Sequence, residues 1–344
     1  MLKMSKPVNI CIDARPLQNA HWSRGVGVLL RNLLPKMGQA APEAEVTLIT
    51  LKGKSLPALF SRERRLETRR LERPNRFNWM ADQLFMPALV EKSGAELFFA
   101  TDFNSYLVPR KGLKVVSMAY DLIPFIFPET MASQPLPVRA CWRTNFPKLR
   151  KSNAVIAISQ ATKDDLVRLM GIESERVHVI YPGIDHDLFN MANAGDAARS
   201  REVLARFGIA GRFLLYVGDS EWRKNLRRVL EALAGTGDDL NIVLAGKRAL
   251  TDTTLHGWVE ELGLQGRVIF PGFIPDADLP LLYGAAAAFV FPSLYEGFGF
   301  PIAEAMACGC PVISSSVSSM PEVAGGAAFL VDPLNVAEIR AAIK

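Results

Sequence analysis

Cysteine, histidine and long apolar runs are scarce in this sequence, and each scarcity excludes a class of protein. The four cysteines among 344 residues lack the paired spacing of a zinc site or a disulfide framework, which favours a reducing compartment. The four histidines are scattered without metal-ligand spacing. No apolar run approaches the roughly 20 residues that span a bilayer, and residues 1–13 lack the apolar run of a secretory leader. We therefore expect a cytoplasmic protein that is not integral to a membrane.

Motifs of several nucleotide-using enzymes are missing as well. The sequence contains neither a Gly-x-x-x-x-Gly-Lys-Ser/Thr string nor a dinucleotide-binding glycine fingerprint, so nucleotide hydrolysis and hydride transfer have no support. It has no low-complexity tract, and its 49% hydrophobic and 22% charged residues are ordinary for packed domains. Because domains usually hold about 100 to 200 residues, we expect two of them.

The net charge of +5 is unevenly distributed. Residues 1–190 hold 27 Lys and Arg against 18 Asp and Glu, whereas the remainder holds 13 against 17. Seven arginines and three glutamates lie in Arg62–Arg76. This cluster fits an anionic membrane surface or a phosphate-bearing substrate, and it fits equally well a solvated helix with Glu and Arg on neighbouring turns. Because no interleaved aromatic residues accompany it, we expect no nucleic-acid partner.

Short, continuous apolar runs alternate with helical periods along the whole chain. Such runs are typical of parallel strands that are covered on both faces, so the sequence predicts an α/β fold. In the first half the expected strands are 8–12, 46–51, 97–100, 114–118 and 154–158. In the second half they are 213–217, 241–245, 268–270, 288–291 and 312–314.

A polar, turn-rich stretch at residues 183–200 separates the two series. It predicts two doubly wound domains, 1–185 and 186–344, that face a central cleft, since ligands of such sheets bind at the carboxyl ends of the strands. Within the first domain, Ser159 is expected to begin a helix that Gly171 ends.

Two adjacent cations, Arg223 and Lys224, lie between the strand 213–217 and a helix with a regular apolar face. Backbone N–H groups and the helix dipole favour an anion at such a junction, and the cations add charge for a phosphate or diphosphate. Basic residues near a helix start are more often simply solvated, so this motif alone leaves both interpretations open.

A strand, a glycine loop and a helix follow one another over residues 288–311. Gly297 and Gly299 are expected in a loop whose backbone can approach a ligand closely. Glu296 would lie on that loop and Glu304 in the first helical turn, which puts both carboxylates at one rim. A carboxylate accepts two hydroxyl hydrogen bonds at once, which suits the vicinal diol of a ribose or hexose. The alternative is that Glu304 only complements the helix dipole and Glu296 is solvated.

Residues 296–313 resemble, almost residue for residue, the E-G-F-G-x-P-x-x-E-A-M-A-x-G-x-P-V-I string of the retaining GT-B glycosyltransferases of family four. Further segments are similar to that family in the same order: 12–17, 25–27, 156–159, 179–185, 223–225, 270–274 and 282–283. The resemblance covers most of the chain. It implies the GT-B fold, with two Rossmann-like domains, the first on the acceptor side and the second holding a nucleotide-sugar donor.

Carried over residue by residue, the resemblance implies a set of catalytic and donor-binding residues. Arg223 and Lys224 would hold the donor diphosphate, Glu296 the transferred sugar and Glu304 the ribose hydroxyls. It also implies backbone contacts to the donor, from Gly297, Phe298 and Gly299 to sugar and phosphate, from Phe273 and Ile274 to the base, and from Gly25 and Gly27 to the diphosphate.

The resemblance implies neither a metal nor a cofactor beyond the nucleotide-sugar. Asp276 and Asp278 spell the Asp-x-Asp of metal-dependent transferases, but they open an expected helix, where Asp is an ordinary cap. Arg223, Lys224 and helix termini must then stabilise the leaving diphosphate. In such a retaining transferase the leaving phosphate oxygen takes the proton of the incoming hydroxyl, so Glu296 is not expected to be a nucleophile.

The chain departs from the family pattern at three places. Tyr120 and Asp121 stand where relatives commonly have His-Asp, and a tyrosine hydroxyl can still hydrogen-bond a sugar or phosphate. Asp219 replaces an arginine found in some relatives. The chain ends at Lys344 inside an expected helix, where relatives continue, so its C-terminal end would be truncated.

These observations favour a hexosyltransferase of surface-polysaccharide assembly that acts on a lipid-linked or oligosaccharide acceptor. Segments 12–17 and 120–128 are similar to mannosyltransferases, which makes GDP-mannose the expected donor. The basic first domain favours an acceptor with a pyrophosphate at an anionic membrane surface, on the inner face of the membrane. The alternatives are a UDP-sugar-dependent transferase, an epimerase, a storage-glucan synthase, or a non-catalytic scaffold that binds nucleotide-sugars.

Overall fold

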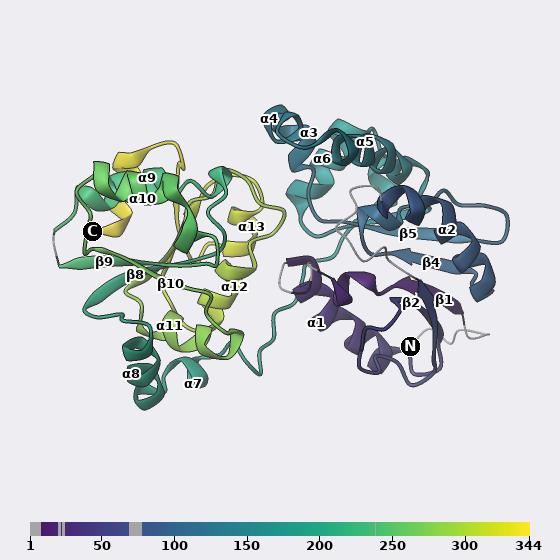
Figure 1. Ribbon diagram of the computed structural model, residues 1–344, viewed down its shortest axis with the longest axis horizontal. Helices are drawn as coiled ribbons and strands as arrows, with labels where there is room; N and C mark the ends of the chain where they lie inside the picture. Colours follow the sequence, from purple (N-terminus) through teal and green to yellow (C-terminus); the bar gives the residue numbers. More distant parts are fainter. Residues whose placement is uncertain (1–7, 20–21, 23–24, 69–77, 238) are drawn as a thin grey trace. The chain divides into compact units, whose positions relative to one another are not determined.

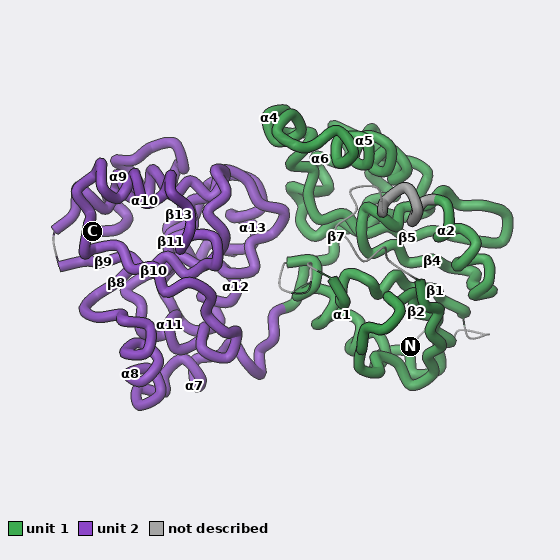
Figure 2. The backbone as a smooth tube through the Cα atoms, in the orientation of Figure 1, with its two compact units in different colours: residues 1–183 green, residues 184–344 purple. Residues whose placement is uncertain are grey.

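The computed structural model describes residues 8–19, 22, 25–68, 78–237 and 239–344. It forms two compact units, residues 1–183 and 184–344 (Figure 2). The division lies two residues before the boundary that the sequence predicts. Each unit is an α/β domain with a parallel sheet of its own.

In the described part of the first unit, parallel strands form one sheet in the order β3-β2-β1-β4-β5-β6-β7 (Figure 1). The strands are β1 (Asn9–Asp13), β2 (Glu45–Leu51), β3 (Glu63–Thr68), β4 (Leu97–Ala100), β5 (Lys114–Ala119), β6 (Ala154–Ala157) and β7 (Val177–Val179). The α-helices are α1 (Gly25–Ala40), α2 (Asn78–Ser93), α3 (Ile123–Ile126), α4 (Pro128–Ala132), α5 (Leu136–Asn145) and α6 (Gln160–Met170). The 3-10 helices are η1 (Arg15–Gln18), η2 (Phe103–Ser105), η3 (Phe146–Lys151) and η4 (Ser174–Arg176).

In the described part of the second unit, the parallel sheet has the order β10-β9-β8-β11-β12-β13. Its strands are β8 (Arg212–Val217), β9 (Leu240–Ala245), β10 (Val268–Gly272), β11 (Ala288–Phe291), β12 (Val312–Ser315) and β13 (Phe329–Val331). The α-helices are α7 (Met191–Ala194), α8 (Ala197–Arg206), α9 (Leu226–Ala234), α10 (Thr253–Glu261), α11 (Leu279–Ala285), α12 (Phe300–Ala307), α13 (Met320–Ala324) and α14 (Val336–Ile343). The 3-10 helices are η5 (Trp222–Lys224), η6 (Ala249–Thr251) and η7 (Asp276–Asp278).

Helices cover both faces of the second sheet, with α9 and α10 on one face and α11 on the other (Figure 1). This explains why its strands are continuously apolar: Leu214, Leu215 and Ile242 are at most 1% exposed. Helix α9 contributes Val229, Leu230 and Leu233 to the same core, each at most 1% exposed. Burying one such side chain stabilises the fold by about 1.5 to 3 kcal/mol, so this face fixes α9 on the sheet.

The expected strands are all present, with ends that agree to within two residues, and the parallel α/β fold is confirmed. The helix that begins after Ser159 is confirmed too, since the Ser159 hydroxyl accepts the Thr162 N–H and Gly171 closes the helix with φ +61°. Three strands were not expected: β3, β7 and β13. Both β7 and β13 are only three residues long.

The strand β3 overturns the expectation of a solvated helix in the arginine cluster for residues 63–68. These residues pair in parallel with β2 at the edge of the sheet. The guanidinium of Arg65 pairs with Glu63 at 2.5 Å, and that of Arg64 donates to the Ser93 carbonyl at 2.6 Å. Charged side chains suit an exposed strand edge because they discourage pairing with a second chain. The rest of the arginine cluster, residues 69–76, which is the part of the expected membrane contact not yet placed, lies outside the described residues.

None of the helices in the described parts of the chain is long and apolar enough to cross a membrane.

Replacing Gly246 with alanine should destabilise the second unit. The added Cβ would lie 2.0 Å from the carbonyl oxygen of Gly218, so the backbone after β8 and β9 would have to separate. Overpacking of this kind costs about 1 to 3 kcal/mol. Scanning calorimetry should therefore show a lower unfolding temperature for this unit.

Gly257→Ala is the matched control, because nothing lies within 4 Å of the added Cβ in α10. Removing a glycine from a helix interior stabilises by about 0.5 to 1 kcal/mol. Shifts in the same direction for both variants would contradict the assignment of Gly246 to a close backbone approach.

Candidate functional site

The strand order of the second unit reverses between β8 and β11. The chain adds β9 and β10 on one side of β8, and then crosses to the other side for β11, β12 and β13. Ligands of doubly wound sheets bind at such a reversal, beside the carboxyl ends of the strands. The two segments that leave these carboxyl ends are residues 218–225 and 292–299.

Three charged side chains from the two segments contact one another. Lys224 Nζ lies 2.6 Å from Oε1 of Glu296, and Arg223 Nη1 lies 2.8 Å from Oε2 of the same carboxylate. All three side chains are at least 85% buried, with exposures of 12%, 15% and 11%. The alternative that these cations are merely solvated is therefore wrong. Arg223 also pairs with the more exposed Glu221, at 2.9 Å.

The turn that carries the two cations is fixed by Asn225. This residue has the left-handed φ of +62°, which asparagine tolerates better than other residues with a side chain. Its buried amide Nδ2 donates to the carbonyls of Pro292, at 3.0 Å, and Pro333, at 2.6 Å. The backbone N–H of Leu294 donates in turn to the Arg223 carbonyl at 2.7 Å. These bonds join the two segments and set the direction of the cations.

The loop that carries Glu296 is held by two serines from the connection after β12. Ser318 Oγ donates to the Glu296 carbonyl at 2.7 Å, and Ser319 Oγ donates to the Phe298 carbonyl at 2.7 Å. Ser318 itself has a left-handed φ of +56°. Strained backbone of this kind persists where the surrounding bonds determine it, and it clusters at functional sites. Neither serine was predicted from the sequence, although the serines at 314–316, 318 and 319 were a signal.

Glu296 is ionised although it is buried. Burial raises the pKa of this carboxyl group, but Lys224 and Arg223 more than offset that effect, so its pKa lies below the ordinary value. The three groups together carry one net positive charge. An anion that reaches them would compete with Glu296 for the two cations.

Glu304 differs from Glu296 in both position and charge state. It lies in the second turn of α12, not in the first as expected, because that helix begins at Phe300. The hydroxyl of Tyr283 donates to its Oε2 at 3.1 Å. Burial raises the pKa of Glu304 to about 7, against the bond from Tyr283, which lowers it, and Asp276 raises it further. Near neutral pH this carboxyl group therefore exchanges its proton readily.

The other expected donor contacts lie on separate loops of the second unit. Gly299 precedes α12 with a φ of +111°, which only glycine adopts without strain, and Phe298 is 8% exposed. Phe273 and Ile274 directly follow the edge strand β10, and their side chains point to different environments. Phe273 is 60% exposed, whereas Ile274 is buried in the core.

The remaining expected residues belong to the first unit. Gly25 is the first residue of α1, and Gly27 is buried in its first turn. Tyr120 directly follows β5, and its hydroxyl donates to the Thr101 carbonyl at 2.9 Å, so its proton is already used within the unit. Burial, together with nearby Asp102, holds the pKa of Tyr120 well above its ordinary value. The Asp121 carboxylate accepts the Ile123 N–H at 3.1 Å.

No group of three His, Cys, Asp or Glu side chains that could hold a metal ion is present in the described ranges. Asp276 and Asp278 open helical structure, as expected, since they form the 3-10 helix η7 and Asp278 is the N-cap residue of α11. The side chain of Asp278 makes no capping hydrogen bond, so the capping role expected of it is wrong. Asp278 Oδ2 instead accepts a hydrogen bond from Arg206 at 2.6 Å.

Two family models match the chain, and together they cover most of it. Residues 23–188 match "Glycosyltransferase Family 4", and residues 207–344 match "Glycosyl transferases group 1". The chain belongs to this glycosyltransferase family.

Its relatives include O-antigen enzymes of enteric bacteria. The O-antigen chain mannosyltransferase B of Escherichia coli is 34% identical over 245 residues, which are 70% of this chain and 62% of that protein. The O-antigen chain mannosyltransferase RfbU of Salmonella typhimurium is 28% identical over 65% of this chain and 58% of its own length. The matched region thus spans less than two thirds of these relatives.

Solved structures share the fold at low sequence identity. Anabaena Alr3699/HepE, in complex with UDP and glucose, superposes with a TM-score of 0.72 at 20% identity, over 98% of this chain and 90% of that chain. WaaG, a glycosyltransferase involved in lipopolysaccharide biosynthesis, gives 0.69 at 19% identity, over 98% and 89%. These likenesses confirm the expected GT-B fold, with two Rossmann-like parallel-sheet domains.

Glu304→Gln should change how stability depends on pH. The raised pKa of Glu304 means that the folded protein holds this proton more tightly than the unfolded chain does, whose pKa is near 4.5. The folded state therefore loses stability as pH rises from about 4.5 to about 7, by about 3 kcal/mol in all. The variant lacks this loss. Calorimetry should find it more stable than the natural protein at pH 8 and no more stable at pH 4.

Glu338→Gln, an exposed position on α14, serves as the control and should leave the pH dependence as it is. A parallel pH dependence for the natural protein and Glu304→Gln would contradict a buried, readily protonated Glu304.

Proposed function

We propose that this chain transfers a mannosyl group from GDP-mannose to a lipid-linked or oligosaccharide acceptor during synthesis of a surface polysaccharide. The observation that carries this proposal is the buried Arg223–Glu296–Lys224 group at the strand-order reversal of the second unit. The proposal places the protein in the cytoplasm, peripheral to the inner face of the membrane. It is supported by the family and by the names of the O-antigen mannosyltransferases among the relatives.

In this proposal the cations change partner when the donor binds. The diphosphate takes Arg223 and Lys224 away from Glu296, since the diphosphate of a nucleotide-sugar carries two negative charges and the carboxylate carries one. The released Glu296 carboxylate then accepts hydroxyl hydrogen bonds from the transferred sugar. Because Ser318 and Ser319 bond the backbone of this loop, the carboxylate can change partner while its loop stays in place.

Other donor contacts in the proposal come from the loops around this group. The ionised Glu304 accepts the ribose hydroxyls. The remaining donor contacts come from the backbone at Gly297, Phe298 and Gly299 for sugar and phosphate, at Phe273 and Ile274 for the base, and at Gly25 and Gly27 of the first unit for the diphosphate. Tyr120 and Asp121 follow β5 in the first unit. Because the Tyr120 hydroxyl donates its proton to the Thr101 carbonyl, it would accept a hydrogen bond from a sugar hydroxyl, and a phosphate contact would require it to release Thr101.

The proposed reaction retains the configuration of the sugar and needs no metal. The bond between the anomeric carbon and the β-phosphate oxygen breaks, and the acceptor oxygen bonds to the same face of that carbon. The acceptor proton passes to the leaving phosphate oxygen. Arg223 and Lys224 stabilise the charge that develops on this leaving group, which is the main electrostatic demand of the step. No protein nucleophile takes part.

A second candidate is a UDP-sugar-dependent transferase or epimerase of the same fold. The observation in its favour is the structural neighbour Alr3699/HepE, whose complex holds UDP and glucose. An epimerase would turn over a nucleotide-sugar without an acceptor, whereas a transferase would not. Nucleotide preference and acceptor dependence therefore separate these candidates.

Among GDP, UDP and ADP, GDP should stabilise the protein most in a thermal-shift assay. A ligand at 100 times its dissociation constant stabilises by about 2.7 kcal/mol. Lys224→Ala and Glu304→Ala should each remove most of this shift. Arg212→Ala is the matched control, because Arg212 lies at the amino end of β8 and pairs with the exposed Asp239. Selective binding of UDP would favour the second candidate. A protein that responds to none of the three nucleotides would contradict both candidate functions.

Turnover of GDP-mannose should require Lys224 and should not require a metal. Removing one group that stabilises the leaving charge costs about 100-fold or more in kcat, so Lys224→Ala should lose activity by at least that factor. EDTA should leave the rate unchanged, and NMR of the product should show the α-anomer. A β-linked product, or a rate that EDTA abolishes, would contradict the proposed mechanism.

A further inference from the structure

One buried hydroxyl beside the candidate site has no hydrogen-bond partner. Ser293 follows β11 on the segment that carries Glu296, and its side chain is fully buried. Its Oγ makes no hydrogen bond to any of the described residues. The other buried serines in the described part of the second unit, Ser314, Ser315 and Ser319, all donate their hydroxyls to backbone carbonyls. Leaving a buried hydroxyl unpaired is costly, so the exception at Ser293 requires a reason.

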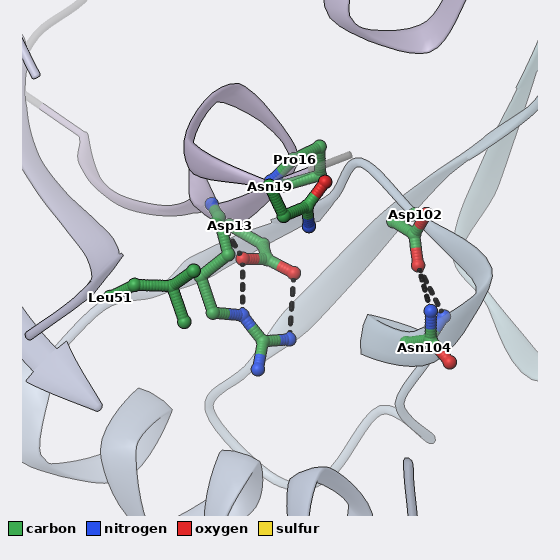
Figure 3. A pocket seen from close by; sticks show the side chains of 7 residues that line it. Asp13, Pro16, Asn19, Leu51, Asp102 and Asn104 are labelled. Carbon is green, nitrogen blue, oxygen red and sulfur yellow. Dashed lines mark hydrogen bonds and ion pairs between the residues drawn. The ribbon is translucent and has the colours of Figure 1, made fainter. Parts of the chain in front are cut away.

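The strand-order reversal of the first unit, between β1 and β4, provides a comparison. Asp13 ends β1 and accepts hydrogen bonds from Nε and Nη2 of Arg15, at 2.8 and 2.9 Å (Figure 3). Together with the buried Asp102, these two residues line a small pocket. Thr101 directly follows β4, and its hydroxyl donates to the Asp13 carbonyl at 2.5 Å. The hydroxyl at the end of the neighbouring strand is therefore already used in the first unit, whereas that of Ser293 is not.

The Ser293 hydroxyl lies close to the Glu296 carboxyl group. Burial raises the pKa of Glu296, while Lys224, Arg223 and, with a smaller effect, the Ser293 hydroxyl lower it. Both oxygens of this carboxylate are already taken by cations, Oε1 by Lys224 at 2.6 Å and Oε2 by Arg223 at 2.8 Å. The hydroxyl is thus the neighbour of a carboxylate whose present partners are stronger.

The backbone around Ser293 is fixed on both sides. The amide of Asn225 donates to the Pro292 carbonyl at 3.0 Å, and the hydroxyl of Ser315 donates to the carbonyl of Ser293 itself. The remaining freedom is rotation about the Cα–Cβ bond of Ser293, which moves the hydroxyl between staggered positions. Ser293 can therefore gain a partner without any movement of its loop.

The proposed change of partner at the site leaves Glu296 in need of a hydrogen-bond donor. When the diphosphate takes Lys224 and Arg223, a carboxylate that is only 8% exposed loses both cations. A buried carboxylate without partners is unstable and tends to take up a proton. A protonated Glu296 would accept fewer hydroxyl hydrogen bonds from the sugar. The hydroxyl of Ser293 is a donor that stays beside it, because no other bond holds that hydroxyl.

We propose that Ser293 is a positioning residue for the transfer reaction, whose hydroxyl donates to the Glu296 carboxylate once the donor diphosphate has taken the two cations. The inference rests on the proposed function and assigns a new partner to the released Glu296. With one oxygen bonded to Ser293, the carboxylate stays ionised and oriented, and its remaining lone pairs accept the hydroxyls of the transferred sugar. The hydroxyl is unpaired before the donor binds because its partner is still held by the cations.

The change of partner can be imitated without a donor, in the full chain. Lys224→Met removes one cation at a similar side-chain length and frees Oε1 of Glu296. Ser293→Ala should leave the unfolding temperature of the natural protein unchanged or raise it, because it removes an unpaired hydroxyl. In the Lys224→Met background it should lower that temperature by about 2 to 4 °C, because the hydroxyl then bonds the carboxylate. Scanning calorimetry at pH 8 measures both effects.

Ser314→Ala is the matched control, since Ser314 is an equally buried serine of the same unit whose hydroxyl donates to the Phe291 carbonyl at 3.1 Å. It should lower the unfolding temperature by similar amounts with and without Lys224. If Ser293→Ala also has the same effect in both backgrounds, its hydroxyl does not respond to the loss of the cation and the proposal is overturned.

Titration calorimetry with GDP and GDP-mannose gives a second test that keeps both cations. Ser293→Ala should bind GDP as well as the natural protein does, because water can hydrate Glu296 when no sugar is present. Its affinity for GDP-mannose should fall by about tenfold, which corresponds to about 1.4 kcal/mol. Ser293→Cys should lie between the two proteins, since a thiol is a weak donor. An equal loss of affinity for GDP and GDP-mannose would indicate a merely structural role and would overturn the proposal.

The two tests separate failure of this proposal from failure of the proposed function. A natural protein that does not bind GDP-mannose would contradict the donor assignment, while the unfolding temperatures would still decide whether Ser293 serves Glu296. Binding and turnover of GDP-mannose that do not depend on Ser293 would overturn this inference alone and leave the proposed function in place.

Discussion

The second unit depends on one buried carboxylate held between two cations. Without Glu296, the buried Lys224 would lose the carboxylate that it contacts and Arg223 would keep only the more exposed Glu221, and breaking such a buried pair costs several kcal/mol. Without the cations, Glu296 could not remain ionised among buried groups. The left-handed turn at Asn225 and the serines after β12 hold the three charged groups in contact. The three charged groups are thus held in place by the protein itself, which suits the anionic donor that we propose.

The two strand-order reversals of the chain share a plan and differ in charge. Each brings a buried carboxylate against an arginine at the carboxyl ends of the central strands. In the second unit a second cation, Lys224, contacts the buried carboxylate, whereas in the first unit a second buried carboxylate, Asp102, lines the same pocket.

The sequence predicted the sheets well because buried parallel strands must be continuously apolar. It missed β3 because an edge strand needs no such run, and its alternating Glu and Arg suit a helix equally well. Within the site, the pattern located Arg223, Lys224 and Glu296 but not their contact, since 72 residues separate Lys224 from Glu296. It also could not predict the protonation of Glu304, which depends on Tyr283, a side chain from another helix 21 residues away. Such contacts arise only from the strand order and from packing between elements.

The bond between Asn225 and Pro333 has a consequence for the order of folding. These two residues are 108 positions apart, yet the bond helps to fix the turn beside the site's two cations. Helix α14, just after Pro333, is joined to α9 as well, through Arg340 and the carbonyl of Glu231. On the ribosome, strands β8 to β11 emerge well before either contact can form. The bonds to Pro292 and Leu294 can hold the turn before then, and the bond to Pro333 completes it by closing a longer loop.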